Sequence, residues 1–366
     1  MHADGVAIDP SRALQAMMAG EKPGGHGERC VAVGALDMAI WDAVAKARGL
    51  PLYRLLARDF GNLDALSSIP VYAGGGYYFP DNDLGQLRAE AQYFRDLGFL
   101  SAKIKIGALD IAIDCTRIET ALDVLGSGSN LAVDAVYSYA PQQALDIARA
   151  IEPYGLRWFE DICDPLDYET LANVVRAYQP AISAGEATFS LSDARNLLRY
   201  AGLRSGRDVL TFDPAHCYGI SEFVRIIRRF EENGWAANSF LPHSGHIYGL
   251  HLAAGLRLGG CECNPHNFQP FGGFADDTVI RGSLVSPQAA PGWRPWLYCP
   301  GCRRRCRCLY GANTLRCRKC LGLVYTSQSE RRHWRALRRA DSIRRCMAGT
   351  AYGIDPAFPP KPLHMC

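Results

Sequence analysis

The sequence predicts an α/β protein whose largest part is a (β/α)8 barrel. Short β-rich runs alternate with amphipathic stretches such as 141–155, whose apolar residues recur at helical spacing. Eight such runs over about 200 residues match the length of this fold. A doubly wound open sheet is the alternative, but no glycine-rich phosphate loop follows an early strand. The predicted strands cover residues 69–75, 101–107, 131–135, 156–161, 181–186, 208–213, 236–243 and 261–264.

Charge and cysteine content divide the chain near Pro291–Gly292. Residues 1–293 hold 24 Lys and Arg against 34 Asp and Glu, whereas residues 294–366 hold 16 against 3. Of the 14 cysteines, 6 lie in the first part and 8 in the second. The overall net charge of +3 therefore describes neither part. The predicted domains are a helical segment over 1–66, the barrel over 67–290 and a Cys- and Arg-rich tail over 291–366.

The composition indicates a globular protein, since 48% of the residues are hydrophobic and 10% are aromatic. No run of about 18 residues lacks charged or strongly polar side chains, which argues against a membrane span. The opening residues MHADGVAIDPSR lack the basic and then apolar layout of a secretory signal. We therefore expect a cytoplasmic protein without a membrane partner.

An ionisable residue stands at the end of six of the eight predicted strands. Each lies 26 to 30 residues after the one before it, which is about one β/α unit. In a parallel barrel these strand ends share the C-terminal rim, where enzymes of this fold place their active sites. The six residues are Lys105, Asp134, Glu160, Glu186, Asp213 and His243.

Three of these residues, Asp134, Glu160 and Glu186, follow consecutive strands and are expected to converge. Three carboxylates at one poorly solvated spot repel one another unless a cation lies among them. An all-oxygen site with open positions suits Mg²⁺, which keeps water and takes substrate oxygens. The alternative is that the three are rim residues in ordinary salt bridges.

Two lysines are expected beside the carboxylates. Lys103 and Lys105 lie two residues apart on one strand, so both side chains face the barrel interior. Their mutual repulsion, close to a divalent cation, is expected to lower the pKa of one lysine and make it a base. One solvated and one structural lysine would be the alternative.

Histidine and aspartate are expected on the other side of the site. His243 ends the seventh predicted strand and Asp213 the sixth, so the carboxylate can orient and charge the imidazole. The neighbouring His216, His246 and His251 are expected to be structural. A Mg²⁺ ion between a lysine base and a histidine acid suits removal of a proton α to a carboxylate. The acid could then expel a β-hydroxyl as water, or acid and base could exchange a proton in a racemase or epimerase.

These residues resemble those of the enolase superfamily, mandelate racemase subgroup. Segment 31–56 carries Trp41, Asp42 and Lys46 in the W-D-x-x-x-K pattern of that family, and the similarity runs from Met17 to Pro287. Within the subgroup, the chain is most similar to members that dehydrate D-tartrate. The stretches that carry this likeness are EKPGGHGER, YAGGGYY, KIKIG, DPLDY, DARNLLRY, FDPAHCYGI, AAGLRLGG and FQPFGGF.

The resemblance implies a Mg²⁺-dependent dehydratase of a hydroxy-dicarboxylate or acid sugar, with D-tartrate converted to oxaloacetate and water. It implies a homo-oligomer and a truncated capping domain over 1–66. An inactive barrel, whose working part is the tail, is the alternative that this truncation leaves open. By residue, the resemblance assigns Mg²⁺ to Asp134, Glu160 and Glu186, the base to Lys105, the acid to His243 with Asp213, and substrate contacts to Lys103 and Lys22.

The tail resembles small bacterial zinc-ribbon proteins. Two C-x2-C pairs stand 14 residues apart, a spacing that suits four thiolates around Zn²⁺, and disulfides are less expected in the cytoplasm. The predicted ligands are Cys299, Cys302, Cys317 and Cys320. The stretch 329–345 reads as an arginine-rich helix that could bind nucleic acid through phosphates, or could serve only as a solvated surface.

Overall fold

The chain divides into two compact units, residues 1–292 and 293–366. The computed structural model of the protein describes part of each unit. The described residues are 9–20, 27–61, 64–265, 274, 278–287, 297–298, 301–302, 305–306 and 320.

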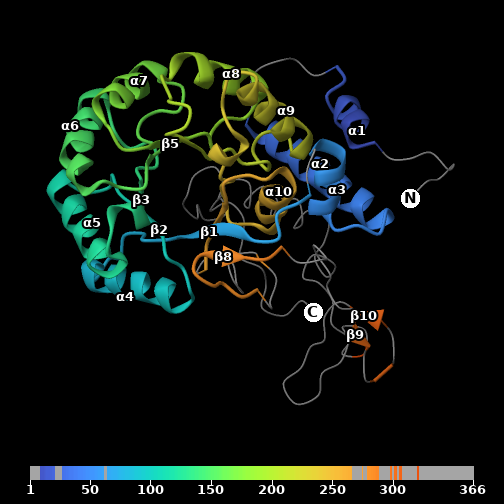
Figure 1. The fold of residues 1–366 in the computed structure, drawn as a ribbon, viewed down its shortest axis with the longest axis horizontal. Coiled ribbons are helices and arrows are strands. Elements are labelled where there is room, and N and C mark those ends of the chain that lie inside the picture. The colour runs from blue at the N-terminus through green and yellow to red at the C-terminus, as the bar shows by residue number, and fades with distance from the viewer. Residues whose placement is uncertain are drawn as a thin grey trace, which may run out of the picture. The chain divides into compact units, whose positions relative to one another are not determined.

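The described residues of the first unit include the predicted barrel (Figure 1). Seven parallel strands pair in the order β6-β5-β4-β3-β2-β1-β7. The eighth position belongs to Phe240, which forms a parallel bridge to Leu210 and accepts a hydrogen bond from the Gly259 N–H at 3.0 Å. Since β7 also pairs with β1, the sheet closes on itself. The strands are β1 (Ile69–Gly74), β2 (Ala102–Lys105), β3 (Leu131–Asp134), β4 (Phe159–Glu160), β5 (Ile182–Ala184), β6 (Val209–Leu210) and β7 (Cys261–Cys263).

All eight predicted strand positions are therefore occupied, but one differs in form. The segment predicted as a strand over 236–243 contains the 3₁₀ helix η3 (Ala237–Ser239) and only the single bridge at Phe240. Pro242 follows and has no N–H to donate, so it contributes to the pairing only through its carbonyl, which accepts a hydrogen bond from the Glu262 N–H at 3.2 Å. A short antiparallel strand, β8 (Leu284–Val285), pairs with the first residues of β1.

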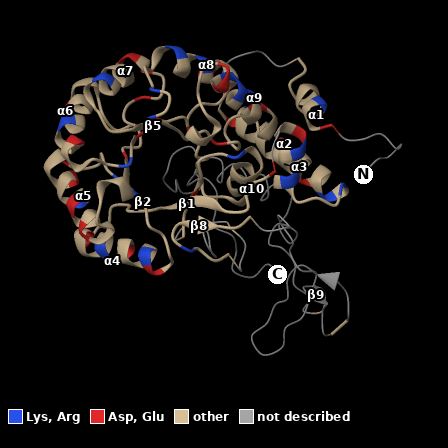
Figure 2. Ribbon diagram, viewed as in Figure 1, with Lys and Arg blue, Asp and Glu red and all other residues tan. Residues whose placement is uncertain are grey.

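The outer layer consists of helices that connect successive strands (Figure 1). Most of these helices bury one face, as in α9, where Phe223, Ile227 and Phe230 point inward while Arg225 and Arg228 remain exposed. Figure 2 shows both charge signs interspersed along this layer, whereas the strands are mostly uncharged. The layer comprises α4 (Asp83–Asp96), α5 (Ile111–Leu125), η1 (Gly128–Asn130), α6 (Pro141–Ile151), η2 (Glu152–Tyr154), α7 (Tyr168–Ala177), α8 (Leu191–Tyr200), α9 (Ile220–Glu231) and α10 (Ile247–Leu256).

Helix α10 is apolar on nearly every side, which predicts burial on both faces. The N-terminal helix α3 (Leu52–Phe60) covers its outer face. Gly255 permits this close approach, because a Cβ there would lie 2.6 Å from the Tyr53 carbonyl oxygen. The buried His251 accepts a hydrogen bond from the Tyr53 N–H through Nδ1 at 3.2 Å, and thereby fixes α3 on the barrel.

Helices α1 (Pro10–Met17) and α2 (Glu28–Ala47) precede α3, and α2 is held by a buried polar network. The Asp37 carboxylate accepts hydrogen bonds from the Ser221 hydroxyl at 2.7 Å and from the Ser221 N–H at 3.1 Å. Trp41 Nε1 donates to the same hydroxyl at 3.0 Å. Asp42 and Lys46 form an i,i+4 ion pair at 2.5 Å. The W-D-x-x-x-K pattern therefore supplies one buried tie to α9 and one surface pair.

Within residues 293–366, strands β9 (Leu297–Tyr298) and β10 (Arg305–Cys306) form an antiparallel pair. Cys302 and Cys320 are exposed, whereas Cys299, Cys317 and the arginine-rich stretch 329–345 lie outside the described residues. In the parts of the chain that the structure describes, no helix combines the length and the apolar composition needed to cross a bilayer.

The close contact between Gly219 and Asp37 predicts that a methyl group added at Gly219 lowers the free energy of unfolding. Gly219 has φ +94°, and a Cβ there would lie 2.4 Å from Asp37 Oδ2. Gly234 has φ +81° with open space around it. We expect Gly234→Ala to lower the free energy of unfolding by about 1–2 kcal/mol through backbone strain alone. Gly219→Ala should cost about 1–3 kcal/mol more, measured by urea unfolding; equal losses would show that the Asp37 network relaxes freely.

The burial of His251 predicts a pH dependence of stability. Burial lowers the pKa of His251 to about 3. An unfolded histidine titrates near about 6.5, so below that pH the unfolded chain binds a proton that the folded chain refuses, and stability falls. We expect His251→Asn to remove up to about 3 kcal/mol of the loss of unfolding free energy between pH 7 and pH 4. Parallel stability profiles for the two proteins would contradict this assignment.

Candidate active site

The register of three neighbouring strands brings the first site residues side by side. Lys105 of β2 pairs with Asp134 of β3, and Asp134 pairs with Glu160 of β4. All three therefore stand at one level of the C-terminal mouth of the barrel. Glu186 lies two residues beyond the end of β5 and reaches the same mouth.

Four carboxylates meet at this level. One oxygen from each of Asp134, Glu160, Asp161 and Glu186 lies within 4.8 Å of the others. Glu160 is completely buried, and its Oε2 accepts a hydrogen bond from Trp158 Nε1 at 2.6 Å. Burial raises the pKa of Glu160 to about 7, although the nearby ammonium group of Lys103 opposes this rise. The structure thus brings together the three predicted carboxylates and adds a fourth.

The two lysines contact these carboxylates directly. Lys103 is 1% exposed, and its Nζ lies 2.6 Å from Glu160 Oε1, 3.3 Å from Glu262 Oε1 and 3.5 Å from Asp134 Oδ2. Lys105 binds the same Asp134 oxygen, and its ammonium group lies 5.6 Å from the centre of the Tyr77 ring. Both side chains therefore face the mouth of the barrel, as the two-residue spacing predicts.

The pKa of each lysine is raised above its usual value. Burial lowers the pKa of Lys105, but the charge and hydrogen bond of Asp134, together with the charge of Glu262, make the net shift upward. The pKa of Lys103 is raised as well, because Glu160 and Glu262 outweigh the cost of burial. In the absence of a cation, contacts with carboxylates therefore outweigh the repulsion between the lysines. The expectation of a lowered lysine pKa supposes a divalent cation beside them and stays a prediction.

His243 lies between two carboxylates. Its Nδ1 is 3.1 Å from Asp213 Oδ2, and its Nε2 is 3.0 Å from Glu186 Oε2. Burial lowers the pKa of His243, but hydrogen bonds to Asp213 and Glu186 raise it well above its usual value. The imidazole is therefore protonated at neutral pH and can act as an acid. The Ala215 N–H donates to the other Asp213 oxygen at 2.7 Å and helps to orient that carboxylate.

Sequence reasoning missed Glu262, a further carboxylate that contacts Lys103 and His243 at the mouth of the barrel. It lies on β7, its Oε2 accepts a hydrogen bond from the Ser244 N–H at 3.1 Å, and the same oxygen lies 3.9 Å from His243 Nε2. The signal was available, because Glu262 stands inside the eighth predicted strand. It comes only 19 residues after His243, however, and so falls outside the regular interval of the other strand ends.

Two of the other histidines near the site, His246 and His216, are placed by the structure, whereas Lys22 is not among the described residues. His246 caps α10 by accepting a hydrogen bond from the Gly249 N–H, and its Nε2 lies 3.4 Å from Asp213. His216 lies near the site, with its ring centre 6.0 Å from that of His243.

The donor set fits a hard divalent cation. Six carboxylates face the mouth or its wall against three cationic side chains, so negative charge is in excess. The four clustered donors are all oxygen atoms, and oxygen is the ligand that Mg²⁺ requires. The carboxylates are those of Asp134, Glu160, Asp161, Glu186, Asp213 and Glu262, and the cations are those of Lys103, Lys105 and His243.

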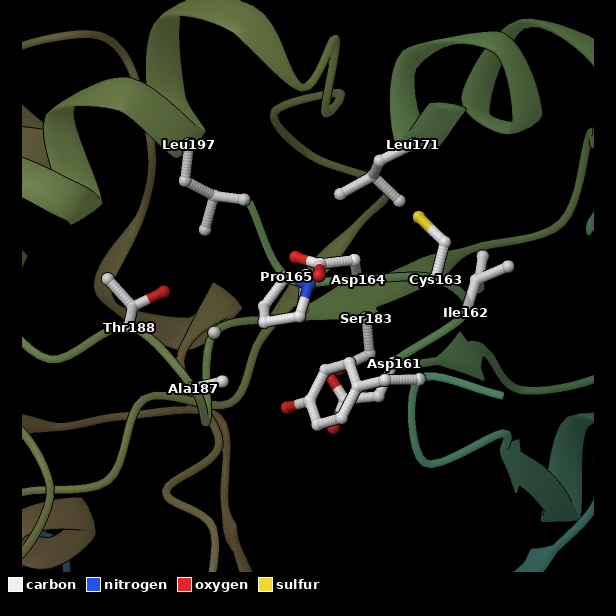
Figure 3. A pocket seen from close by; sticks show the side chains of 13 residues that line it. Asp161, Ile162, Cys163, Asp164, Pro165, Leu171, Ser183, Ala187, Thr188 and Leu197 are labelled. Atoms are coloured by element: carbon white, nitrogen blue, oxygen red, sulfur yellow. The ribbon is translucent and has the colours of Figure 1, made fainter. Parts of the chain in front are cut away.

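A pocket of about 340 Å³, including its open mouth, lies beside the carboxylate cluster (Figure 3). Its wall includes Asp161, Tyr137, Ser183 and Thr188, and apolar side chains such as Leu171 complete the lining. Lys105 contacts Asp134 on β3, and His243 contacts Glu186 beyond β5; these two strands lie on either side of β4 in the sheet. The site therefore offers a lysine and an imidazolium on two sides of a carboxylate group.

The sequence of this chain is similar to those of known proteins. A family model described as enolase C-terminal domain-like matches residues 86–293. Arabinonate dehydratase of Saccharolobus solfataricus is 27% identical over 238 residues, which are 64% of this chain and 60% of that protein. L-talarate/galactarate dehydratase of Salmonella typhimurium is 28% identical over 242 residues, which are 66% of this chain and 57% of that protein. The chain thus spans about 60% of the length of these relatives.

Solved structures agree with the sequence matches. L-talarate dehydratase from Polaromonas sp. JS666, complexed with Mg and L-glucarate, superposes with a TM-score of 0.64 at 26% identity. The match covers 78% of this chain and 76% of that one. A racemase from Streptomyces coelicolor A3(2) with bound magnesium gives a TM-score of 0.67 at 26% identity over 79% of this chain and 76% of that one. Because the family model covers more than half of the chain, we conclude that the protein belongs to the enolase superfamily.

Proposed function

We propose that the protein is a Mg²⁺-dependent dehydratase of a hydroxy acid, with D-tartrate as the preferred substrate and oxaloacetate as the product. The observation that carries this proposal is the placement of Lys105 and protonated His243 on two sides of the clustered carboxylates. A base and an acid on either side of a cation site suit removal of a proton from one carbon and of a hydroxyl from the next.

Each side chain then has a defined part. Lys105, once it has released its own proton, takes the proton α to the substrate carboxylate. His243 gives its Nε2 proton to the departing β-hydroxyl, which leaves as water, and the resulting enol tautomerises to the keto acid. Asp213 keeps the imidazole oriented through Nδ1. Asp134, Glu160 and Glu186 would hold Mg²⁺, which would polarise the substrate carboxylate and offset the charge that develops on it.

Two observations support an acid-sugar substrate. Relatives of similar sequence are named as dehydratases of arabinonate and of L-talarate and galactarate. Lys103 is buried with its charge directed at the mouth, where it would bind a substrate carboxylate. The choice of D-tartrate rests on the stretches that resemble tartrate-dehydrating members, such as DPLDY and DARNLLRY.

A racemase or epimerase of the same group is the second candidate. The same placement of Lys105 and His243 would let one group remove the α proton and the other return it from the opposite side. The two candidates differ in their products, because only dehydration forms a keto acid and water.

The test is a screen of acid sugars, D-tartrate included, with and without Mg²⁺. We expect keto-acid formation that depends on the metal, and Lys105→Ala should lower kcat by at least about 10²-fold, since it removes the base. Lys46→Ala is the matched control, because Lys46 lies on the surface in a pair with Asp42. Full activity in Lys105→Ala would overturn the assigned base.

A second variant separates the two candidates within the same screen. His243→Gln should keep exchange of the α proton with D₂O but lose keto-acid formation, because only the departure of the hydroxyl needs the acid. Racemisation or epimerisation by a wild-type protein that forms no keto acid would favour the racemase instead.

For residues 293–366, we propose a Zn²⁺ site on Cys299, Cys302, Cys317 and Cys320. The β9–β10 pair supports it, since these strands flank the first C-x2-C pair. We expect the purified protein to contain one equivalent of zinc by elemental analysis, and Cys302→Ser to lose it while Cys308→Ser retains it. Zinc-free wild-type protein would refute the site.

Three further expectations stay predictions: nucleic-acid binding by 329–345, a homo-oligomeric state and a cytoplasmic location.

A further inference from the structure

Asp161 faces the carboxylate cluster although it directly follows Glu160. Successive residues of a strand point to opposite sides, so both carboxylates could not reach one site from an extended chain. Strand β4 ends at Glu160, and Asp161 has φ +48°, in the left-handed region. Backbone hydrogen bonds on both sides fix this turn: Asp161 N–H donates to the Ser183 carbonyl at 3.3 Å, and Asp161 C=O accepts from Tyr137 N–H at 2.6 Å.

The Asp161 side chain is buried and has an unused oxygen. The residue is 3% exposed, and Oδ2 has no hydrogen-bond partner among the described residues. One Asp161 oxygen lies within 4.8 Å of oxygens from Asp134, Glu160 and Glu186. Burial of a carboxylate without a compensating partner costs several kcal/mol, so an unpartnered oxygen at this spot indicates a group that a ligand satisfies.

The Ser183 hydroxyl and the Lys103 ammonium group do not supply the missing partner of Asp161 Oδ2. Figure 3 labels Asp161, Ser183 and Thr188 among the side chains that line the pocket. The Ser183 hydroxyl is engaged with Thr211 Oγ1 at 3.3 Å. The ammonium group of Lys103 binds Glu160, Glu262 and Asp134, and no ion pair to Asp161 accompanies them among the described residues. The Tyr137 hydroxyl lies beside Asp161 but makes no hydrogen bond among the described residues. The acidic neighbours Glu186, Glu160 and Asp134 surround the same carboxylate, which is an environment that a cation neutralises.

We propose that Asp161 supplies a fourth carboxylate to the cation centre formed by Asp134, Glu160 and Glu186. This inference rests on the proposed function, which places Mg²⁺ among the other three. A fourth carboxylate adds negative charge and another oxygen to the ligand set. Ca²⁺ takes six to eight oxygen ligands and tolerates irregular geometry, whereas Mg²⁺ requires a near-ideal octahedron and keeps several waters. Asp161 therefore strengthens binding of divalent ions in general and favours Ca²⁺ over Mg²⁺.

The experiment measures ion affinity without turnover. Asp161→Asn removes the charge but keeps the size, and asparagine accepts the left-handed conformation readily. Asp164→Asn is the matched control, because Asp164 borders the same pocket, is exposed, and lies outside the carboxylate cluster. Titrations with MnCl₂ followed by electron paramagnetic resonance, and with MgCl₂ and CaCl₂ by calorimetry, give Kd for each protein.

We expect Asp161→Asn to raise the Kd for Mn²⁺ by about 10- to 100-fold, with a larger factor for Ca²⁺ than for Mg²⁺. Asp164→Asn should leave every Kd unchanged. Asp161→Gly, which the positive φ also permits, repeats the test if the asparagine variant is unstable.

Glu160→Gln separates this inference from the proposed function. Wild-type protein that binds no divalent ion would contradict both. Binding by the wild type that Glu160→Gln weakens and Asp161→Asn leaves intact would overturn the role of Asp161 alone, and the three-carboxylate site would stand.

Discussion

The buried ammonium group of Lys103 is the interaction on which the mouth of the barrel depends. It contacts carboxylates from β3, β4 and β7, three strands that meet only when the barrel is closed. Lysine is almost never fully buried unless it is paired, and each of these carboxylates would repel the others without it. Loss of one partner from such a network leaves uncompensated buried charge, which costs more than the pair contributes. The network therefore ties the chemistry of the site to closure of the sheet.

Periodicity in the sequence predicts the barrel and most of its site. The runs around Ile69, Leu131 and Ile182 are short, apolar and bounded by turn residues, and each becomes a buried strand. Regular spacing of ionisable residues at strand ends predicts that Asp134 and Glu160 share one rim, since parallel strands in register bring equivalent ends together.

Other features of the site could not be predicted in this way. The alternation rule places Asp161 away from Glu160, and only a left-handed backbone reverses it. Glu262 falls out of step because the segments that join α10 to His243 and to β7 are short, although α10 is as long as α7 and α8. The pKa of Lys105 depends on which carboxylates it touches, and distances between side chains of different strands are not contained in a one-dimensional pattern.

Backbone strain gathers where β3 and β4 leave the barrel. Val136 and Tyr137 have φ +47° and +60°, a conformation that is rare for a β-branched or bulky residue. Strained residues persist only where the surroundings over-determine them, and they cluster at functional sites. Here the Val136 N–H donates to Asp134 Oδ1 at 2.9 Å, and the Tyr137 N–H donates to the Asp161 carbonyl. The two loops thus hold the carboxylates in place at the expense of favourable backbone angles.

The packing of α3 on α10 has a consequence for how the chain is made. The Tyr53–His251 hydrogen bond joins residues 198 positions apart. Strand β1 likewise pairs with β7, which is synthesised much later. Synthesis at about 5–20 residues per second would leave the N-terminal helices without their docking surface for roughly 10–40 s. During that interval the nascent chain exposes the apolar face of α3, which makes it a natural client for chaperones at the ribosome.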